Sequence, residues 1–185
     1  MLIGTREGKQ MTNKGIVLER YIRDIPDWPK KGILFRDITP LLADPQAFAA
    51  AVDALCADFG GTGIEYVAAV EARGFIFGAA VAKTLRVGFV PIRKKGKLPF
   101  KTESISYALE YGTDTLQVHR DAIRSKAKVL MVDDLLATGG TMAAACKLIE
   151  KIGGRVAGIA FLIELKELAG RNKLGGYKIN TVISY

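Results

Sequence analysis

The chain has 185 residues, of which 49% are hydrophobic and 25% are charged. That balance is typical of one globular domain with a substantial core, and it excludes a chain that is disordered throughout. No apolar run reaches the roughly 18 residues that cross a membrane, and the amino-terminal segment lacks the apolar stretch of a secretory signal. We therefore expect no membrane partner.

The formal net charge is +8, which suits either nucleic acid or a small, highly anionic ligand. The densest basic cluster is the segment "IRKKGKLPFK". Aromatic residues do not alternate with its cations as they do in single-strand binding platforms, so we expect no nucleic-acid partner. The two cysteines, Cys56 and Cys146, lie on apolar faces of predicted helices. We expect both to be reduced core residues, which favours a cytoplasmic location.

In chain order, residues 1–14 are expected to be a flexible tail, and residues 15–185 one domain. Apolar residues at helical spacing predict a helix over 16–25 and another over 46–59. The proline-containing segment between them is expected to be a loop. After these come four short, continuous apolar runs at 64–70, 87–92, 127–132 and 156–163. Runs of this kind, with helices between them, predict an α/β fold with a mainly parallel central sheet flanked by helices.

The segment "SISYALEYGTDTLQVHRD" alternates apolar and polar residues on both sides of "GTD". This pattern predicts an antiparallel hairpin that projects from the sheet. Since the hairpin directly follows the basic segment, it would lie next to any ligand held there.

The segment "ATGGT" stands between a buried strand and a helix, and comprises Ala137, Thr138, Gly139, Gly140 and Thr141. Backbone N–H groups and two hydroxyls at a helix start suit a phosphate, although the same sequence also suits an ordinary strand-to-helix turn. It is neither a Walker loop nor a dinucleotide-binding fingerprint.

Two aspartates, Asp133 and Asp134, precede this turn and would repel a phosphate unless hydrogen-bond donors satisfy them. The vicinal hydroxyls of a sugar are suitable donors, because an ionised carboxylate only accepts. A phosphate in the turn and a diol on the acids together describe a ribose 5-phosphate. Binding of Mg²⁺ by the two aspartates is the alternative.

The segment "VLMVDDLLATGGT" resembles the phosphoribosyl-pyrophosphate (PRPP) signature of the type I phosphoribosyltransferases. "PKKGILFRDITPLLADP", "EARGFIFG", "RKKGKLP" and "LEYGTD" resemble further segments of the family members that use adenine. The resemblance implies the family's fold, with an amino-terminal hood over about 15–45 and a flexible hairpin lid over about 97–120. It also implies transfer of the 5-phosphoribosyl group from PRPP to adenine, which gives AMP and pyrophosphate.

The resemblance assigns roles to individual residues. Asp133, Asp134 and residues 137–141 would bind the ribose and phosphate of PRPP or AMP. Pyrophosphate would be held by Arg73, Gly74, Arg93, Lys94 and Lys97, and Arg73 and Lys97 would also serve catalysis. Adenine would lie against Leu34, Phe35, Arg36 and Leu162. On the lid, Glu110 would exchange a proton with the base, and Tyr111 would pack or donate a hydroxyl.

Family members use Mg²⁺ held mainly by PRPP oxygens and water, so we expect no direct protein ligand to the metal. They are commonly homodimers, and we expect the same here. Two alternatives stay open: the same chemistry on hypoxanthine, guanine or xanthine, and a PRPP-sensing regulator without catalysis. The sequence has no carboxyl-terminal lysine segment like that of relatives that recognise a 6-oxo group, which favours adenine.

Overall fold

The computed structural model describes residues 15–108 and 112–185, so the predicted tail over 1–14 lies outside the described residues. The chain divides into two compact units, Met1–Ala54 and Leu55–Tyr185, and each is described by itself.

The smaller unit is built around an antiparallel strand pair. Its elements are the 3₁₀ turn η1 (Leu18–Tyr21), β1 (Arg23–Pro26), β2 (Leu34–Asp37), α1 (Thr39–Ala43) and most of α2 (Pro45–Cys56). Asp44 begins α2, because its carboxylate accepts hydrogen bonds from the amides of Gln46 at 2.9 Å and Ala47 at 2.8 Å. The second predicted helix is therefore present.

The helix predicted over 16–25 is wrong. Only η1 is helical there, and the chain then enters β1, in which Arg23 pairs with Asp37 and Pro26 with Leu34. A segment of ten residues gains little from helix formation alone, so pairing with a distant strand prevails. The segment expected to be a loop contains β2, the partner strand, and α1.

The larger unit contains a seven-stranded sheet in the order β5-β6-β4-β3-β7-β8-β9. Strands β4, β3, β7, β8 and β9 are parallel, whereas β5 and β6 form an antiparallel hairpin on β4. The strands are β3 (Tyr66–Val70), β4 (Gly88–Lys94), β5 (Thr102–Ala108), β6 (Thr113–His119), β7 (Lys128–Leu136), β8 (Arg155–Glu164) and β9 (Ile179–Ser184). The predicted α/β fold with a mainly parallel sheet is confirmed. Strand β9 was not predicted.

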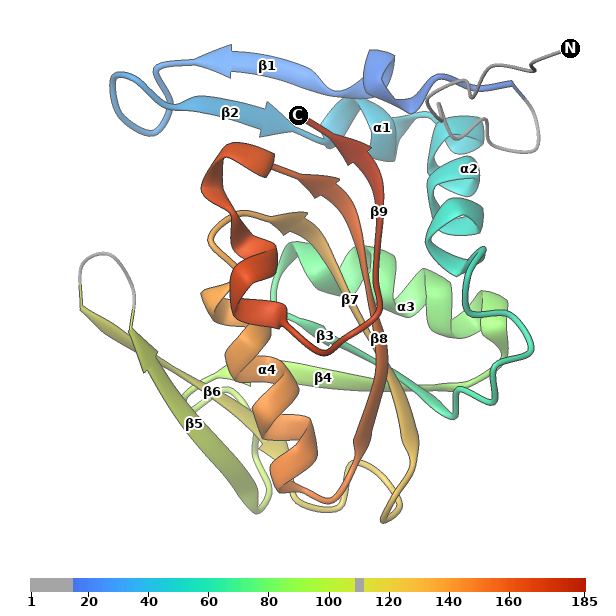
Figure 1. Ribbon diagram of the computed structural model, residues 1–185, viewed down its shortest axis with the longest axis vertical. Helices are drawn as coiled ribbons and strands as arrows, with labels where there is room; N and C mark the ends of the chain where they lie inside the picture. The colour runs from blue at the N-terminus through green and yellow to red at the C-terminus, as the bar shows by residue number, and fades with distance from the viewer. Residues whose placement is uncertain (1–14, 109–111) are drawn as a thin grey trace, which may run out of the picture. The chain divides into compact units, whose positions relative to one another are not determined.

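Helices α3 (Arg73–Leu85) and α4 (Gly140–Lys151) cover opposite faces of this sheet (Figure 1). Successive residues of β3 show the division. Ala69 faces α3, because a Cβ built on Gly78 of that helix would lie 2.6 Å from the Cβ of Ala69. Ala68 belongs to the core that the sheet shares with α4. Both cysteines are buried and neither is in a disulfide, as expected.

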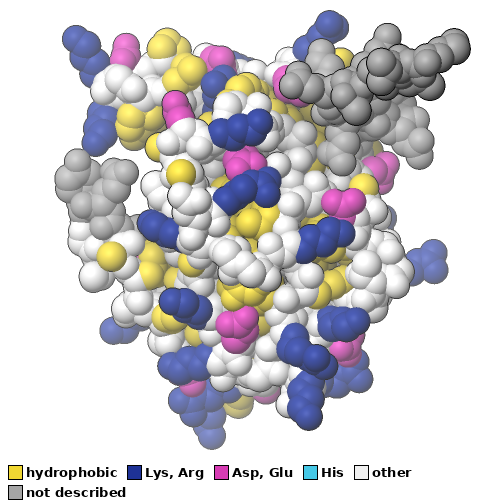
Figure 2. Space-filling view, viewed as in Figure 1, with side chains coloured by type: hydrophobic (Ala, Val, Ile, Leu, Met, Phe, Trp, Pro, Cys, Tyr) yellow, Lys and Arg dark blue, Asp and Glu magenta, His cyan; other side chains and the backbone are white. Residues whose placement is uncertain are grey.

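Each of these helices begins just after the carboxyl end of a parallel strand, α3 after β3 and α4 after β7. Two helix amino termini therefore meet at one edge of the sheet, which is the usual ligand-binding edge of open α/β sheets. On the face shown in Figure 2, Lys and Arg side chains form separate groups with Asp and Glu among them, not a continuous basic stripe. None of the helices in the described part of the chain is long and apolar enough to cross a lipid bilayer.

Candidate active site

A cavity of about 250 Å³ lies where β3 and β7 end and α3 and α4 begin. It brings together segments that are some 60 positions apart in the sequence: Arg73 on one side, and Asp133, Asp134 and all five residues of the "ATGGT" turn on the other. The wall consists of residues 70–73, 133–142 and Phe161. The predicted phosphate, ribose and catalytic arginine positions therefore share one cavity.

The two aspartates are largely withdrawn from water. Asp134 is 5% exposed, and its amide donates to Asp133 Oδ1 at 3.0 Å. Burial and then repulsion from Asp134 raise the pKa of Asp133 well above its usual value. Burial also raises the pKa of Asp134, although the Arg73 guanidinium opposes the shift. The carboxylates therefore lack enough donors, which is the condition that a diol or a divalent cation would relieve.

Arg73 is the first residue of α3, where the helix dipole disfavours a cation. Its Nη2 lies 2.7 Å from Asp134 Oδ2, so a carboxylate from β7 compensates this position. Glycine at position 74 lets Asp133 approach the start of α3, because a Cβ there would lie 2.6 Å from Asp133 Oδ1. The role in pyrophosphate binding that the resemblance assigns to Gly74 stays a prediction.

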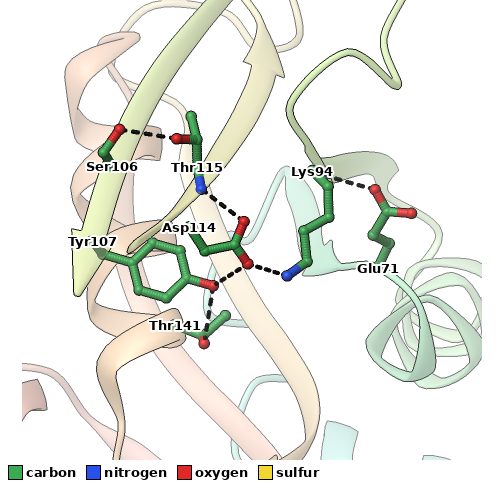
Figure 3. A network of polar contacts seen from close by, with 7 residues as sticks. All are labelled: Glu71, Lys94, Ser106, Tyr107, Asp114, Thr115 and Thr141. Carbon is green, nitrogen blue, oxygen red and sulfur yellow. Dashed lines mark hydrogen bonds and ion pairs between the residues drawn. The ribbon is translucent and has the colours of Figure 1, made fainter. Parts of the chain in front are cut away.

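The basic segment that begins in the last residues of β4 is linked to the cavity through Glu71. Arg93 Nη2 donates to Glu71 Oε2 at 3.0 Å. The Lys94 amide donates to Glu71 Oε1 at 2.7 Å (Figure 3). Desolvation alone would raise the pKa of Glu71, but these two hydrogen bonds outweigh it and lower the value. Arg93 also donates to the Lys97 carbonyl at 3.1 Å. Of these residues only Glu71 lines the cavity, and the predicted pyrophosphate contacts Arg93, Lys94 and Lys97 do not.

The "ATGGT" turn packs against a segment near residue 170 that was not predicted from the sequence. Gly139 has φ +76°, and a Cβ there would lie 2.3 Å from the carbonyl oxygen of Gly170, which begins the 3₁₀ segment η3 (Gly170–Leu174). Only glycine permits both the backbone angle and this approach. The Nζ of Lys173 lies 3.9 Å from the position that a Cβ on Gly140 would take. An unforeseen cation therefore stands at the start of α4.

An ion pair fixes η3 to the sheet. Arg171 donates to both carboxylate oxygens of Glu164, at 2.6 and 2.8 Å, and to Thr181 Oγ1 at 3.1 Å. Glu164 is 5% exposed, and its hydrogen bonds from Arg171 lower its pKa against the effect of burial. Bidentate pairing of this kind is geometrically specific, so it restrains η3, the segment that also carries Lys173.

The predicted adenine contacts are divided between the units. Leu34, Phe35 and Arg36 lie on β2 of the smaller unit, where Leu34 is 46% exposed and the ring of Phe35 is 4.3 Å from that of Trp28. Leu162 is fully buried on β8 of the larger unit, and its neighbour Phe161 lines the cavity. Their convergence on one base stays a prediction. Glu110 and Tyr111 lie outside the described residues.

Among the described residues, no three His, Cys, Asp or Glu side chains are grouped so as to hold a metal ion. Two carboxylates and substrate phosphates are nevertheless a usual binding mode for Mg²⁺, which keeps several waters and seldom uses an all-protein cage. The donor set of Asp133 and Asp134 therefore fits Mg²⁺ that arrives with a phosphate ligand.

Comparison with known proteins gives a consistent result. A family model described as "Phosphoribosyl transferase domain" matches residues 42–181. The adenine phosphoribosyltransferase of Pseudothermotoga lettingae is 55% identical over 168 residues, which are 91% of this chain and 99% of the relative. The crystal structure of the adenine phosphoribosyltransferase of Thermoanaerobacter pseudethanolicus is 53% identical, with a TM-score of 0.88 over 91% of this chain and 98% of that one.

The yeast enzyme is also similar. The adenine phosphoribosyltransferase of Saccharomyces cerevisiae, solved with adenine and D-2,5-dideoxy-2,5-imino-altritol 1,6-bisphosphate, is 38% identical with a TM-score of 0.85. It matches 89% of this chain and 96% of its own. The resemblance deduced from the sequence motifs is confirmed.

Proposed function

The chain belongs to the phosphoribosyltransferase family, and we propose that it transfers the 5-phosphoribosyl group of PRPP to adenine, giving AMP and pyrophosphate. The single observation that carries this proposal is the cavity in which a carboxylate pair, Asp133 and the buried Asp134, faces a helix-start turn and a paired arginine. A 55% identical enzyme that covers the same length favours catalysis on adenine over the oxopurine and regulator alternatives.

The turn over 137–141 would receive the 5′-phosphate. Its backbone N–H groups lie at the amino terminus of α4, and Thr138 and Thr141 add hydroxyls. Lys173 adds a positive charge beside Gly140. Asp133 and Asp134 would accept hydrogen bonds from the ribose 2′- and 3′-hydroxyls, which supply the donors that this buried pair lacks.

Pyrophosphate would lie toward Arg73, Gly74, Arg93, Lys94 and Lys97. As its bond to C1′ breaks, the ribose becomes oxocarbenium-like and adenine attacks C1′. Negative charge then collects on the leaving group, and the cations stabilise it, so positioning and electrostatics carry most of the catalysis. Mg²⁺, bound through PRPP oxygens and water, would neutralise part of that charge.

Adenine would be read by Leu34, Phe35 and Arg36 from the hood, at about 15–45, and by Leu162 on β8. Glu110 would exchange a proton with the base, and Tyr111 would pack beside it, both on the hairpin lid at about 97–120. These roles rest on the sequence resemblance. A lid suits the chemistry because water would otherwise capture the sugar cation.

A cytoplasmic homodimer completes the proposal. Two buried cysteines outside any disulfide suit a reducing compartment. Ile76 on α3 is 40% exposed and Phe100 is 58% exposed, and a second copy would cover such apolar side chains. Light scattering after size-exclusion chromatography tests the dimer, and a mass of one chain at micromolar concentration would reject it.

The enzyme assay uses purified protein, Mg²⁺ and PRPP, with adenine, hypoxanthine, guanine, xanthine or no base. We expect pyrophosphate release and AMP formation with adenine alone. Release with an oxopurine would disprove the assignment of the base site. An absence of turnover with every base would disprove the proposed phosphoribosyltransferase activity.

A further inference from the structure

A polar network runs from Glu71 to Thr141, two residues that line the cavity, through the β5–β6 hairpin (Figure 3). Its centre is Asp114 on β6, whose Oδ2 forms an ion pair with Lys94 Nζ from β4 and accepts from the Tyr107 hydroxyl of β5 at 3.3 Å. The Thr141 hydroxyl, at the start of α4, donates to the Tyr107 oxygen at 3.4 Å. A residue of the phosphate turn is thereby connected to a residue of the pyrophosphate segment.

Asp114 is fixed before any ligand binds. Its Oδ1 accepts from the Thr115 amide at 2.8 Å, so donors from both hairpin strands orient the carboxylate independently of Lys94. The side chain of Asp114 is 20% exposed, and that of Lys94 is 49% exposed. Pairing with Lys94 lowers the pKa of Asp114, and pairing with Asp114 raises the pKa of Lys94. Both groups are therefore ionised at neutral pH.

The Asp114 carboxylate holds the ammonium of Lys94, which ends a long and flexible side chain. A free lysine loses about 2 kcal/mol of rotamer entropy when a ligand immobilises it, and holding the ammonium in advance reduces that loss. One of its three N–H donors is used by Asp114, and two remain for ligand oxygens. The backbone is held as well, because the Lys94 amide donates to Glu71 at 2.7 Å.

We propose that Asp114, supported by Tyr107, is a positioning residue that holds the Lys94 ammonium for pyrophosphate and ties it to Thr141 of the phosphate turn. The proposal rests on the proposed function of this site. Asp114 acts through Lys94 and Thr141, and does not itself contact the substrate. The opposite arrangement is that Asp114 occupies Lys94 and competes with the anion; its removal would then strengthen binding.

The test combines calorimetric binding of pyrophosphate with Mg²⁺ and steady-state kinetics of AMP formation, on wild type, Asp114→Asn, Lys94→Gln and the double variant. Asp114→Asn keeps the shape and removes the charge. We expect pyrophosphate affinity to fall about threefold to tenfold and KM for PRPP to rise by a similar factor, because the pair is partly exposed. The KM for adenine should change less than about twofold in Asp114→Asn. The double variant should be no weaker than Lys94→Gln.

The matched control is Glu103→Gln. Like Asp114, Glu103 lies on the hairpin and pairs with a lysine: its partner is Lys151 of α4, at 2.8 Å. This ion pair lies at the carboxyl end of α4, whereas the phosphate turn is at the amino end. The Glu103→Gln variant should bind pyrophosphate with wild-type affinity. Tyr107→Phe should weaken affinity in the same direction as Asp114→Asn, to a smaller extent, and it provides the test if Asp114→Asn fails to fold.

Unchanged or tighter pyrophosphate binding in Asp114→Asn would overturn the inference, and so would losses that simply add in the double variant. Tyr107→Phe with wild-type affinity would remove the tie to Thr141. These outcomes differ from failure of the proposed function, in which wild type itself forms no AMP. A loss in Glu103→Gln equal to that in Asp114→Asn would reduce the role of Asp114 to general anchoring of the hairpin.

Discussion

The Arg73 guanidinium lies 2.7 Å from the Asp134 carboxylate, so the first residue of α3 is neutralised by the end of β7. The pair joins a cation expected to face pyrophosphate to an anion expected to hold ribose. Two more of the expected pyrophosphate cations are paired with a carboxylate: Arg93 with Glu71, and Lys94 with Asp114. Among the described residues, three of the expected pyrophosphate cations are therefore held in place by carboxylates of the same unit.

Replacement of Arg73 by Gln should harm both stability and function. The buried Asp134 would lose its ion-pair partner, which we expect to cost about 1–3 kcal/mol because Arg73 is partly exposed. KM for PRPP should rise at least about tenfold, as for loss of a charged hydrogen bond. Thermal melts and AMP kinetics measure the two effects. Lys83→Gln, an exposed position in the last turn of α3, should change neither appreciably. Wild-type KM in Arg73→Gln would contradict its role.

Asp133→Asn should stabilise the ligand-free protein while it impairs the enzyme. Because burial and Asp134 raise the pKa of Asp133, the fold favours the protonated carboxyl. That stabilisation is complete below the ordinary value of 3.8 and is lost as pH rises through the raised pKa, so at pH 7 the carboxylate costs stability. Asparagine imitates the protonated form and keeps an acceptor for the Asp134 amide.

We expect the melting temperature of Asp133→Asn at pH 7 to rise by roughly 2–4 °C, equivalent to about 1 kcal/mol in a domain of this size. The difference from wild type should narrow as pH falls toward 4, where wild type also becomes protonated. PRPP binding should weaken, since a hydroxyl loses its anionic acceptor. A lower melting temperature at pH 7 together with unchanged PRPP affinity would refute this account.

Much of the larger unit could be predicted from the sequence because its signals are local. The apolar runs gave β3, β4, β7 and β8, and "ATGGT" marked the start of α4. What escaped prediction depends on contacts between distant segments. Strand β1 exists through its pairing with β2, and β9 lies beside β8. Strand β1 carries no pattern that distinguishes it from a helix or a loop, whereas the β-branched residues of β9 are a strand signal that could have predicted it.

The same distinction holds within the candidate site. The glycine turn and the aspartates are adjacent in sequence, so their motif was visible. Lys173 belongs to no motif, and Asp114 ends the segment "LEYGTD" without a role having been assigned to it. Both are brought toward the site only because η3 folds against Gly139 and the hairpin folds against β4. Identifying such residues requires the tertiary structure, since their spacing along the chain carries no information about the cavity.

Glu164→Gln should destabilise the protein in a pH-dependent way. Pairing with Arg171 lowers the pKa of Glu164, so the fold favours the carboxylate. Its contribution is present above the ordinary value of 4.5 and is lost as pH falls through the lowered pKa. At pH 7 we expect a loss of about 2 kcal/mol, or about 4–8 °C in melting temperature.

The difference between Glu164→Gln and wild type should shrink below pH 4, where the wild-type carboxylate also becomes protonated. Glu167→Gln, an exposed glutamate three positions along the chain, is the control and should stay within about 0.5 kcal/mol of wild type. Equal destabilisation by both variants would show that the ion pair with Arg171 is not the cause.

Lys173→Gln should weaken PRPP binding without disturbing the fold. Its Nζ lies beside Gly140, and within the described part of the chain no salt bridge to Lys173 is found. A lysine ammonium beside a helix start is unfavourable unless an anion binds there, so a 5′-phosphate would gain from it. We expect KM for PRPP to rise about threefold to tenfold with a melting temperature equal to or slightly above that of wild type. Lys147→Gln, on the exposed side of α4, should leave both unchanged. A KM for PRPP that is equally insensitive to Lys173→Gln would show that the backbone of the turn holds the phosphate alone.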